Sequence, residues 1–212
     1  MAFLLASFVL AVTPGPGVLY IVTRTLAHGR VAGVGSVAGV ACGNFLNAVG
    51  AAVGLAALFA VSSLAFTLVK FAGAAYLVWL GVRMLRAPSA AAEPGAPLAP
   101  VSVARLFREG LLVALLNPKT TLFFAAFLPQ FMHGEAPAMH GEAPALPQAV
   151  GLGAIFVGIA ACTDLVYALL AAWFAPRLQR VAGAPAWGRW ASGLGLIALG
   201  VMSALAGQRQ TR

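Results

Sequence analysis

Long stretches of this chain carry no charged side chain, and this feature limits the folds open to it. The stretch from Val31 to Val61 contains no Asp, Glu, Lys or Arg. Charged residues make up only 8% of the 212 residues and hydrophobic residues 61%, whereas an ordinary soluble domain has about 25% charged residues. A soluble fold of this size could not bury so much apolar surface. The sequence therefore predicts an all-α membrane protein that forms one compact domain.

Six segments are apolar enough to be spanning helices, which need about 20 such residues. They are Met1–Val22, a span within Val31–Val61, Leu64–Val82, Gly110–Phe131, Ala149–Ala175 and Trp190–Gly207. The first basic residue, Arg24, follows the first segment instead of preceding it. We therefore expect this segment to remain as a mature helix and not to be cleaved as a signal peptide.

An Ala- and Pro-rich stretch, residues 87–104, is expected to be a flexible linker between three of these helices and the other three. It divides the chain into a first repeat, residues 1–86, and a second repeat, residues 105–212. Because three is an odd number, the second repeat would enter the membrane from the side opposite to the first. We therefore expect two inverted three-helix repeats, an architecture that recurs in secondary transporters.

The basic residues predict how the helices are oriented in the membrane. The loops after the first, third and fifth helices carry Arg24, Arg30, Arg83, Arg86, Arg105, Arg108, Arg177, Arg180 and Arg189. The opposite face has Arg209 and Arg212, together with Lys70, whose side chain can extend outward. Cytoplasmic loops carry the excess of positive charge, so this distribution places both termini outside.

Several other functions find little support in the residues. The net charge of +8 comes from clusters at the ends of apolar segments, which is typical of topology signals and not of nucleic-acid binding. Cys42 and Cys162 lie deep in apolar runs, where we expect them to pack as small hydrophobes. No histidine falls within an expected span, and no nucleophile is paired with a base. The sequence therefore predicts neither an enzyme nor a cofactor or metal site.

A loop between the fourth and fifth expected helices holds a tandem duplication. Residues 132–138 and 139–145 both read Met-His-Gly-Glu-Ala-Pro-Ala. We interpret the duplication as a neutral insertion in an exposed loop. A metal-binding or pH-sensing role for His133 and His140 is the weaker alternative.

The strongest local signal is a run of helix-breaking residues inside the first expected helix. Thr13-Pro14-Gly15-Pro16-Gly17 places two prolines and two glycines close together. Each proline removes a backbone donor and clashes with the preceding turn, and each glycine lowers helix stability. Freed backbone groups are costly in lipid unless they face protein or water, so this break is expected to line a cavity.

The fourth expected helix has a matching break at Asn117-Pro118-Lys119-Thr120. With a rise of about 1.5 Å per residue, the two breaks would meet near the middle of the membrane. Paired interruptions in corresponding helices point to the binding site of a transporter. The N-termini of the half-helices carry a partial positive charge and open amides that suit a carboxylate, and Lys119 adds a full positive charge. The plainer alternatives are a structural kink and a Lys119 side chain that extends to the membrane surface.

Asp164 is the one acidic residue inside an expected span, and an acid within a membrane is a candidate functional group. It could pair with Lys119, bind a solute ammonium, carry a coupling proton, or serve only as a structural hydrogen-bonding group. Tyr167 lies three residues further on and shares the same helix face.

The second expected helix carries small and amide residues at helical spacing. Gly35, Gly39 and Gly43 recur every four residues, which lets another helix approach closely. Asn44 and Asn47 lie three residues apart in the same helix. Their amides could coordinate a solute or bridge two helices.

A set of motifs spread along the chain is specific only in combination. It consists of Thr13-Pro14-Gly15-Pro16, Gly29-Arg30 with Gly33, residues 73–86, Asn117-Pro118-Lys119, Phe123-Phe124 and residues 127–131. Together these motifs resemble the LysE/RhtB family of amino-acid exporters. The similarity covers nearly the whole chain except the linker and the duplicated loop.

The resemblance implies six helices, a location in the plasma (inner) membrane, and export of amino acids or their derivatives in exchange for protons. Members that look specialised for basic amino acids carry acids where this chain has Asn44 and Phe123. This departure favours neutral solutes such as homoserine, threonine or branched-chain amino acids. The alternatives are an exporter of another small solute or of a basic amino acid, and a non-transporting membrane assembly partner.

The implied partners are the amino-acid solute, protons and the lipid bilayer, and a homodimer is compatible with the sequence. In this interpretation the solute binds at the two breaks, with Asn44 and Asn47 beside them. Asp164 and Tyr167 would couple the proton.

Overall fold

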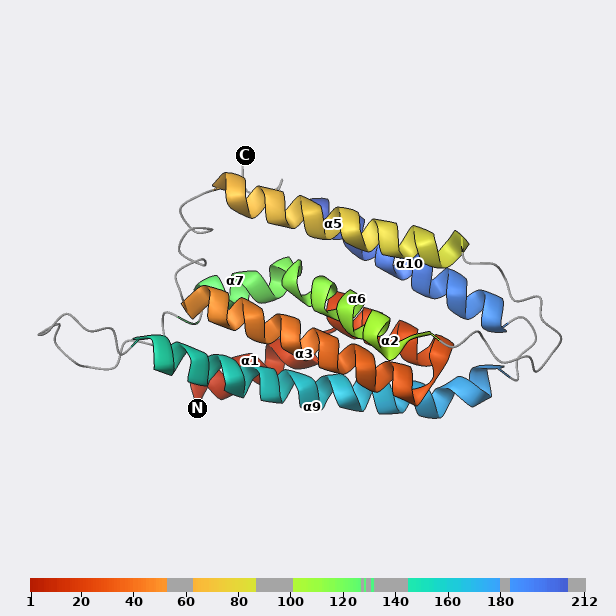
Figure 1. The fold of residues 1–212 in the computed structure, drawn as a ribbon, viewed down its shortest axis with the longest axis horizontal. Helices are drawn as coiled ribbons and strands as arrows, with labels where there is room; N and C mark the ends of the chain where they lie inside the picture. The colour runs from red at the N-terminus through yellow and green to blue at the C-terminus, as the bar shows by residue number, and fades with distance from the viewer. Residues whose placement is uncertain are drawn as a thin grey trace, which may run out of the picture.

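The structure is a bundle of helices that follow the order of the expected spans (Figure 1). It is a computed structural model that describes residues 1–52, 63–86, 101–126, 128, 131, 145–179 and 184–205. The helices are α1 (Ala2–Val12), α2 (Pro16–His28), α3 (Arg30–Ala52), α5 (Ser63–Arg86), α6 (Val103–Leu115), α7 (Pro118–Ala126), α9 (Ala145–Gln179) and α10 (Ala184–Leu205). Most of the expected linker and of the duplicated loop, with His133 and His140, lies outside the described residues. The last two linker positions, 103 and 104, already belong to α6.

Helix interruptions are present at both expected positions, and prolines are the local cause of each. α1 ends at Val12 and α2 begins at Pro16, with a bend of 46° between them. Gly15 precedes α2 in an extended conformation, and Pro16 occupies the first turn, where its missing N–H is not needed. α7 likewise begins at Pro118, directly after Asn117.

Two of the described helices are each long and apolar enough to cross a membrane: α3 and the stretch Pro147–Arg177 of α9. The bent pair α1–α2 would make a third span. Many large apolar side chains face outward instead of into the core, which is typical of a surface that contacts lipid. They include Leu5, Phe8, Trp173, Phe174 and Met202.

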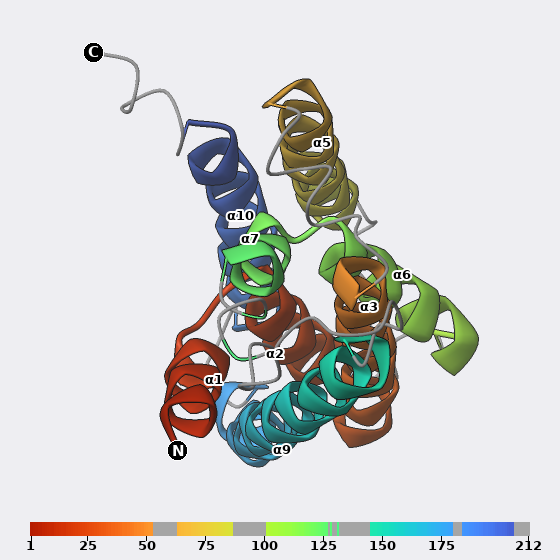
Figure 2. The same cartoon turned by 90° about the vertical axis from the view of Figure 1, so that its left-hand side faces the viewer.

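Corresponding helices of the two halves run in opposite directions (Figure 1), and α5 and α10 lie next to each other at one side of the bundle (Figure 2). In Figure 1, α1 and α2 run from left to right, whereas α6 and α7 run from right to left. α3 packs against α9 and α5 packs against α10, and both pairs are antiparallel. This arrangement brings the two breaks together, because Lys119 of α7 contacts the backbone of Leu10 and Thr13.

α3 packs closely on α6 through small residues, as the spacing of Gly35, Gly39 and Gly43 predicts. A Cβ atom added at Gly43 would lie 2.6 Å from the Leu111 carbonyl oxygen and 2.7 Å from the Ala114 Cβ. The two backbones are therefore in direct contact. This contact holds the next turn of α3 beside the α6–α7 break.

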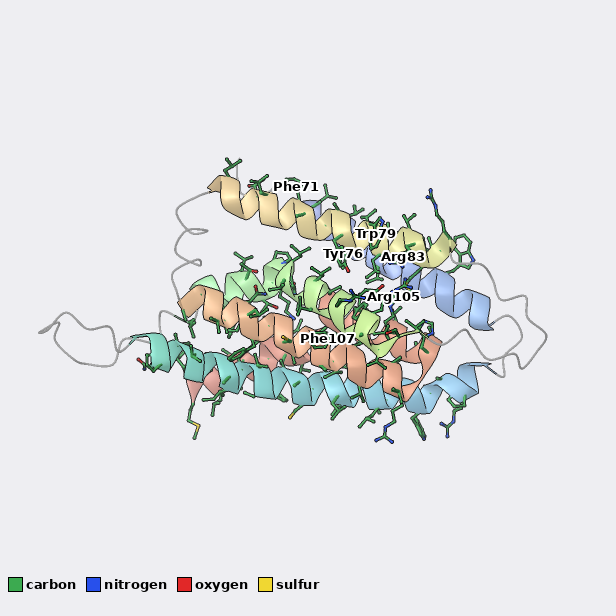
Figure 3. All side chains as sticks on the ribbon, in the orientation of Figure 1. Phe71, Tyr76, Trp79, Arg83, Arg105 and Phe107 are labelled. Carbon is green, nitrogen blue, oxygen red and sulfur yellow. The ribbon has the colours of Figure 1, made fainter. Side chains whose placement is uncertain are left out.

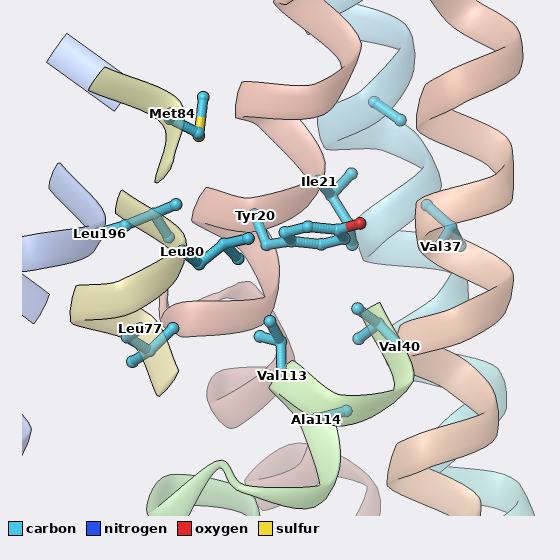
Figure 4. Close-up of a cluster of buried hydrophobic side chains, with 11 residues drawn as sticks. Tyr20, Ile21, Val37, Val40, Leu77, Leu80, Met84, Val113, Ala114 and Leu196 are labelled. Atoms are coloured by element: carbon cyan, nitrogen blue, oxygen red, sulfur yellow. The ribbon is translucent and has the colours of Figure 1, made fainter. Parts of the chain in front are cut away.

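Two buried apolar clusters lie on either side of the breaks. The first gathers around α2 and α6 (Figure 4) and contains Tyr20, Ile21, Val37, Val40, Leu77, Leu80, Met84, Val113, Ala114, Ala168 and Leu196. The second gathers around α1 and α7 and contains Phe3, Ala11, Ala48, Phe123, Phe124, Leu128, Ala149, Phe156 and Ala160. The polar groups of the breaks lie between these two apolar regions.

Replacing Gly43 by Ala tests the close packing of α3 on α6. The new methyl group would meet backbone that cannot move aside, so we expect a loss of about 1–3 kcal/mol in the free energy of unfolding. Gly158→Ala on α9 is the matched control, because nothing lies within 4 Å of its added Cβ. There, a better helix former should stabilise the protein by about 0.5–1 kcal/mol. Thermal unfolding in detergent measures both variants, and equal melting temperatures would contradict the packing.

Candidate functional site

The backbone carbonyl of Leu10 in α1 has no helical partner because a proline stands four residues later. In an α-helix the carbonyl of residue i accepts from the N–H of residue i+4. For Leu10 this position is Pro14, which has no N–H. The Lys119 ammonium takes its place, donating to the Leu10 carbonyl at 2.8 Å and to the Thr13 carbonyl at 2.5 Å.

The carbonyl of Val12 is in the same position with respect to Pro16. Its helical donor is also missing, and the Tyr167 hydroxyl of α9 donates to it at 2.8 Å. A side chain from the second half of the chain thus replaces each of these two backbone donors of the first break.

The second break shows the same arrangement in reverse. Pro118 deprives the Ala114 carbonyl of its helical donor. The Asn47 Nδ2 of α3 donates to this carbonyl at 2.8 Å, and the Asn117 N–H donates to it at 3.1 Å. Here a side chain from the first half of the chain satisfies a break in the second half.

The two half-helices that begin after the breaks are capped differently. Asn117 caps α7, since its Oδ1 accepts from the Lys119 N–H at 3.1 Å and its Nδ2 donates to Thr120 Oγ1 at 3.1 Å. α2 has Gly15 at this position and no side-chain cap. The first backbone N–H groups of α2 therefore have no side-chain acceptor and can bind a ligand. The partial positive charge of the helix N-terminus favours an anionic group at this place.

A small polar cavity of about 40 Å³ lies between the breaks. It is lined by Leu10, Ala11, Thr13, Gly15, Gly17, Val18, Asn44, Asn117, Lys119, Thr120, Phe156, Ala160 and Asp164. Water needs roughly 10–15 Å³, whereas pockets that enclose drug-sized ligands measure about 300–1,000 Å³. The cavity therefore has room for water, and a larger ligand requires the surrounding groups to move apart.

Lys119 and Asp164 bring opposite charges to this cavity. Asp164 on α9 is only 5% exposed, and the two groups act on each other electrostatically. The ion pairs found among the described residues all involve Glu109, however, and the Lys119 ammonium is directed to carbonyls of α1. Asp164 is thus a buried acid beside a cavity, without a cation in direct contact.

Asn44 presents another unused polar group at the cavity. The residue is 7% exposed, and its Oδ1 atom is buried with no hydrogen-bond partner in the part of the chain that the structure describes. A buried acceptor without a partner requires an explanation, such as a bound water or ligand. Asn47, three residues on, bridges two helices instead. The two amides that are equivalent in the sequence therefore have different surroundings.

Most of the residues predicted from the sequence meet at this cavity. Those that line it are Thr13, Gly15, Gly17, Asn44, Asn117, Lys119 and Asp164. Pro14, Pro16 and Pro118 create the breaks, while Asn47 and Tyr167 hydrogen-bond to the breaks without lining the cavity.

Among the other lining residues, Phe156 and Ala160 are not singled out by the sequence analysis, and Thr120 is named there only as part of the second break. Phe156 and Ala160 precede Asp164 by eight and four residues, which places all three on one face of α9. Thr120 follows Asn117 by three residues, the spacing of a helix cap. These spacings are the signals by which the three residues could have been found.

A charge cluster around the buried Glu109 carboxylate lies further along α2 and α6, between these helices and α5, from which Arg83 reaches it (Figure 3). The Glu109 carboxylate accepts from Arg24 at 2.7 Å and from Arg105 at 3.0 Å. Arg83 of α5 lies 3.5 Å from the same carboxylate. The Tyr20 hydroxyl donates to the Leu106 carbonyl in the same region, at 2.7 Å. The cluster ties three helices together on one side of the cavity.

Two expectations from the sequence are corrected by this cluster. The fourth expected helix begins at Gly110 and leaves Glu109 outside, whereas α6 begins at Val103 and buries Glu109. Asp164 is therefore not the only acid within the bundle. Arg24 is expected in a loop, but it lies inside α2 and pairs with Glu109. The four-residue spacing of Arg105 and Glu109 is a signal that the sequence does contain.

Oppositely directed helices, broken by prolines around a polar cavity in an apolar bundle, define a class of protein, the helical membrane transporters. Comparison with known families agrees with this class. Residues 8–207 match the LysE type translocator family, and the chain belongs to that family. It is therefore a multi-pass membrane protein.

Some of the individual proteins that are similar to this chain are named as efflux proteins. The homoserine/homoserine lactone efflux protein of Salmonella typhimurium is 40% identical over 138 residues, which cover 65% of this chain and 66% of the relative. An uncharacterized membrane protein of Vibrio cholerae is 37% identical over 81% of this chain and 80% of its own length. The leucine efflux protein of Salmonella choleraesuis is 29% identical over 64% of each chain. This chain thus matches just under two thirds of the first relative's length, and no solved structure matches it.

Glu109→Gln tests whether the charge cluster stabilises the bundle. The variant leaves Arg24 buried without a countercharge, so we expect a loss of about 3–5 kcal/mol in the free energy of unfolding. The double variant Glu109→Gln/Arg24→Gln removes both buried charges and should recover much of that loss. Thermal unfolding of the wild type, of the single variants Glu109→Gln and Arg24→Gln and of the double variant measures the coupling, and a double variant that loses the full sum of the two single effects would contradict a direct pairing.

Proposed function

We propose that the protein exports neutral amino acids or their derivatives, such as homoserine, threonine and branched-chain amino acids, in exchange for protons. The observation that carries the proposal is the cavity between the two breaks, which holds Lys119, Asp164 and the uncapped start of α2. The names of the relatives, which mention homoserine, homoserine lactone and leucine efflux, support the class of solute.

The solute carboxylate would bind at the start of α2. The open N–H groups there lie beside the cavity, and no side chain caps them. A carboxylate satisfies such donors and is stabilised by the helix N-terminus. Lys119 provides a positive charge in the same cavity.

Asp164 would exchange the proton. In its ionised form the carboxylate attracts Lys119 and the ammonium of a solute. Protonation removes this attraction, so proton binding and solute binding would oppose each other, as an antiporter requires. Tyr167, on the same helix, holds the Val12 carbonyl and so connects the helix of the acid to the first break.

The charge balance of the cavity supports neutral solutes. Asp164 and Lys119 are the two charged residues among those that line it. A basic side chain on the solute would add a positive charge with no countercharge, which is costly in a site of low dielectric constant. A basic amino acid or another small solute as cargo, and a non-transporting assembly partner, are the outcomes that transport measurements would distinguish.

We also propose that the chain spans the plasma (inner) membrane six times, as two inverted three-helix repeats with both termini outside. In this arrangement the broken pair α1–α2 would correspond to the broken pair α6–α7. α3 would correspond to α9, and α5 would correspond to α10. The antiparallel directions of these pairs support the proposal (Figure 1).

Transport in proteoliposomes tests the proposed function. Counterflow of labelled homoserine, threonine, leucine and lysine, with and without a pH gradient, measures both the solute and its coupling to protons. We expect flux of the neutral solutes that a pH gradient accelerates. Absence of flux for every solute would favour an assembly partner, and preference for lysine would overturn the proposed specificity.

Asp164→Asn tests the coupling residue. The variant cannot take up a proton, so we expect flux driven by the pH gradient to fall to background while the protein still inserts into the membrane. Counterflow in the absence of a gradient should persist. Cys162→Ala, two residues away on the exposed side of α9, is the matched control and should keep the coupling. Unchanged gradient-driven flux in Asp164→Asn would remove Asp164 from the mechanism.

Cysteine labelling tests the proposed topology. In a background with Cys42 and Cys162 replaced by Ala, single cysteines at the exposed positions Ala2 and Ser102 report the two ends of the bundle. A membrane-impermeant maleimide added to intact cells should label position 2 and leave position 102 unlabelled. The reverse pattern would invert the orientation.

A further inference from the structure

The three side chains that satisfy the breaks are not equivalent. Tyr167 and Asn47 are neutral and do not line the cavity. Lys119 carries a charge, lines the cavity and crosses over Gly15, where an added Cβ would lie 3.3 Å from Lys119 Cδ. Of these three donors, Lys119 is therefore the one that a ligand in the cavity can reach and displace.

The carbonyls of Leu10 and Thr13, called here the carbonyl pair, already hold an ammonium group. The Lys119 Nζ lies 2.8 Å from the Leu10 oxygen and 2.5 Å from the Thr13 oxygen. Both oxygens belong to the C-terminal end of α1, where the helix dipole attracts positive charge. Unwound carbonyls and half-helix C-termini bind cations in membrane transporters. The carbonyl pair is thus a built site for a primary ammonium.

Asn44 supplies a second, independent observation. Its Oδ1 atom is a buried acceptor without a partner among the described residues, and Asn44 lines the same cavity as Lys119. An acceptor in this state is satisfied by a ligand that brings N–H or O–H donors. The unused group of the cavity therefore also points to a ligand with a donor, as an ammonium has.

We propose that the carbonyl pair is the subsite for the ammonium group of the solute, and that Lys119 occupies it when no solute is bound. This inference rests on the proposed function and specifies how the solute is oriented. The solute's ammonium displaces Lys119 from Leu10 and Thr13, and Asn44 accepts a further hydrogen bond from the solute. The carboxylate lies at the start of α2, on the other side of the same break.

The exchange keeps the charges of the cavity balanced. One ammonium replaces another on the carbonyl pair, so these carbonyls remain satisfied in both states. The released Lys119 carries its positive charge to the carboxylate that the solute brings. Withdrawal of Lys119 from the break also provides space that the small cavity lacks. Solute binding and the loss of the Lys119 hydrogen bonds to the carbonyl pair then occur in one step.

Chemical rescue tests the carbonyl pair as an ammonium site. Lys119→Ala removes the resident ammonium and leaves space that propylammonium fills, because its atoms correspond to Cγ through Nζ of lysine. We expect a lower melting temperature for this variant in detergent. Propylammonium should raise it by about 2–4 °C, the shift expected for roughly one regained polar contact in a chain of this length, and should leave the wild type unchanged.

Controls separate an ammonium site from other effects. Propanol lacks the charge and tetramethylammonium lacks the N–H donors, so neither should rescue Lys119→Ala. Tyr167→Phe loses a donor outside the cavity, and propylammonium should not restore its stability. Equal shifts with all three compounds, or no shift with propylammonium, would overturn the inference. The readout of this experiment is thermal stability and not transport. The rescue can therefore fail although the wild type transports the solute, and it can succeed although the wild type does not.

A second variant covers the case in which Lys119→Ala does not fold. Lys119→Met fills nearly the same volume and removes only the ammonium that competes with the solute. Homoserine should stabilise this variant against heat, and N-acetylhomoserine, which has no ammonium, should not. Equal stabilisation by the two compounds, or by neither, would contradict an ammonium subsite.

Discussion

The structure depends on one constraint, which is that backbone carbonyls freed by proline must find donors in a bundle with little water. Pro14, Pro16 and Pro118 each remove the N–H that would bond to the carbonyl four residues before. In every case a side chain of the opposite half supplies the donor: Lys119 for Leu10, Tyr167 for Val12, and Asn47 for Ala114. Each break therefore takes a donor from the other half. The breaks are thus interfaces between the halves as well as interruptions of the helices.

This mutual arrangement explains why the polar cavity lies where it does. The donors must cross between the halves at the level of the breaks, so they bring polar atoms to the middle of an apolar bundle. Apolar clusters pack on both sides of this region, and the Glu109 cluster fixes α2, α5 and α6 beyond it. What remains is a cavity with one acid, one ammonium and an uncapped helix start. A zwitterion offers the charges that such a site can bind, which connects the fold to the proposed export of amino acids.

The sequence predicts the parts of this account that have local causes. Prolines inside the apolar runs mark both breaks, and a charge inside such a run is conspicuous, so both breaks, Lys119 and Asp164 can be found from the sequence. The partners cannot be found in this way, because Lys119 and Leu10 are more than a hundred residues apart and meet only through the packing of α7 on α1. Asn44 and Asn47 look alike in the sequence, and only their direction from α3 separates them. Glu109 escapes notice because neighbouring arginines make the start of α6 look like a loop.

A double-mutant cycle between Pro16 and Tyr167 tests this constraint most directly. Pro16→Ala restores the backbone N–H four residues after Val12, which is the donor that a continuous helix would direct at the Val12 carbonyl. Tyr167→Phe should therefore cost about 1–3 kcal/mol of unfolding free energy in the wild type, the cost of an acceptor left without a donor where there is little water. In the Pro16→Ala background it should cost less than about 0.5 kcal/mol, because the amide replaces the hydroxyl. An equal cost of Tyr167→Phe in both backgrounds would show that the hydroxyl does not stand in for the missing amide, and would contradict the account.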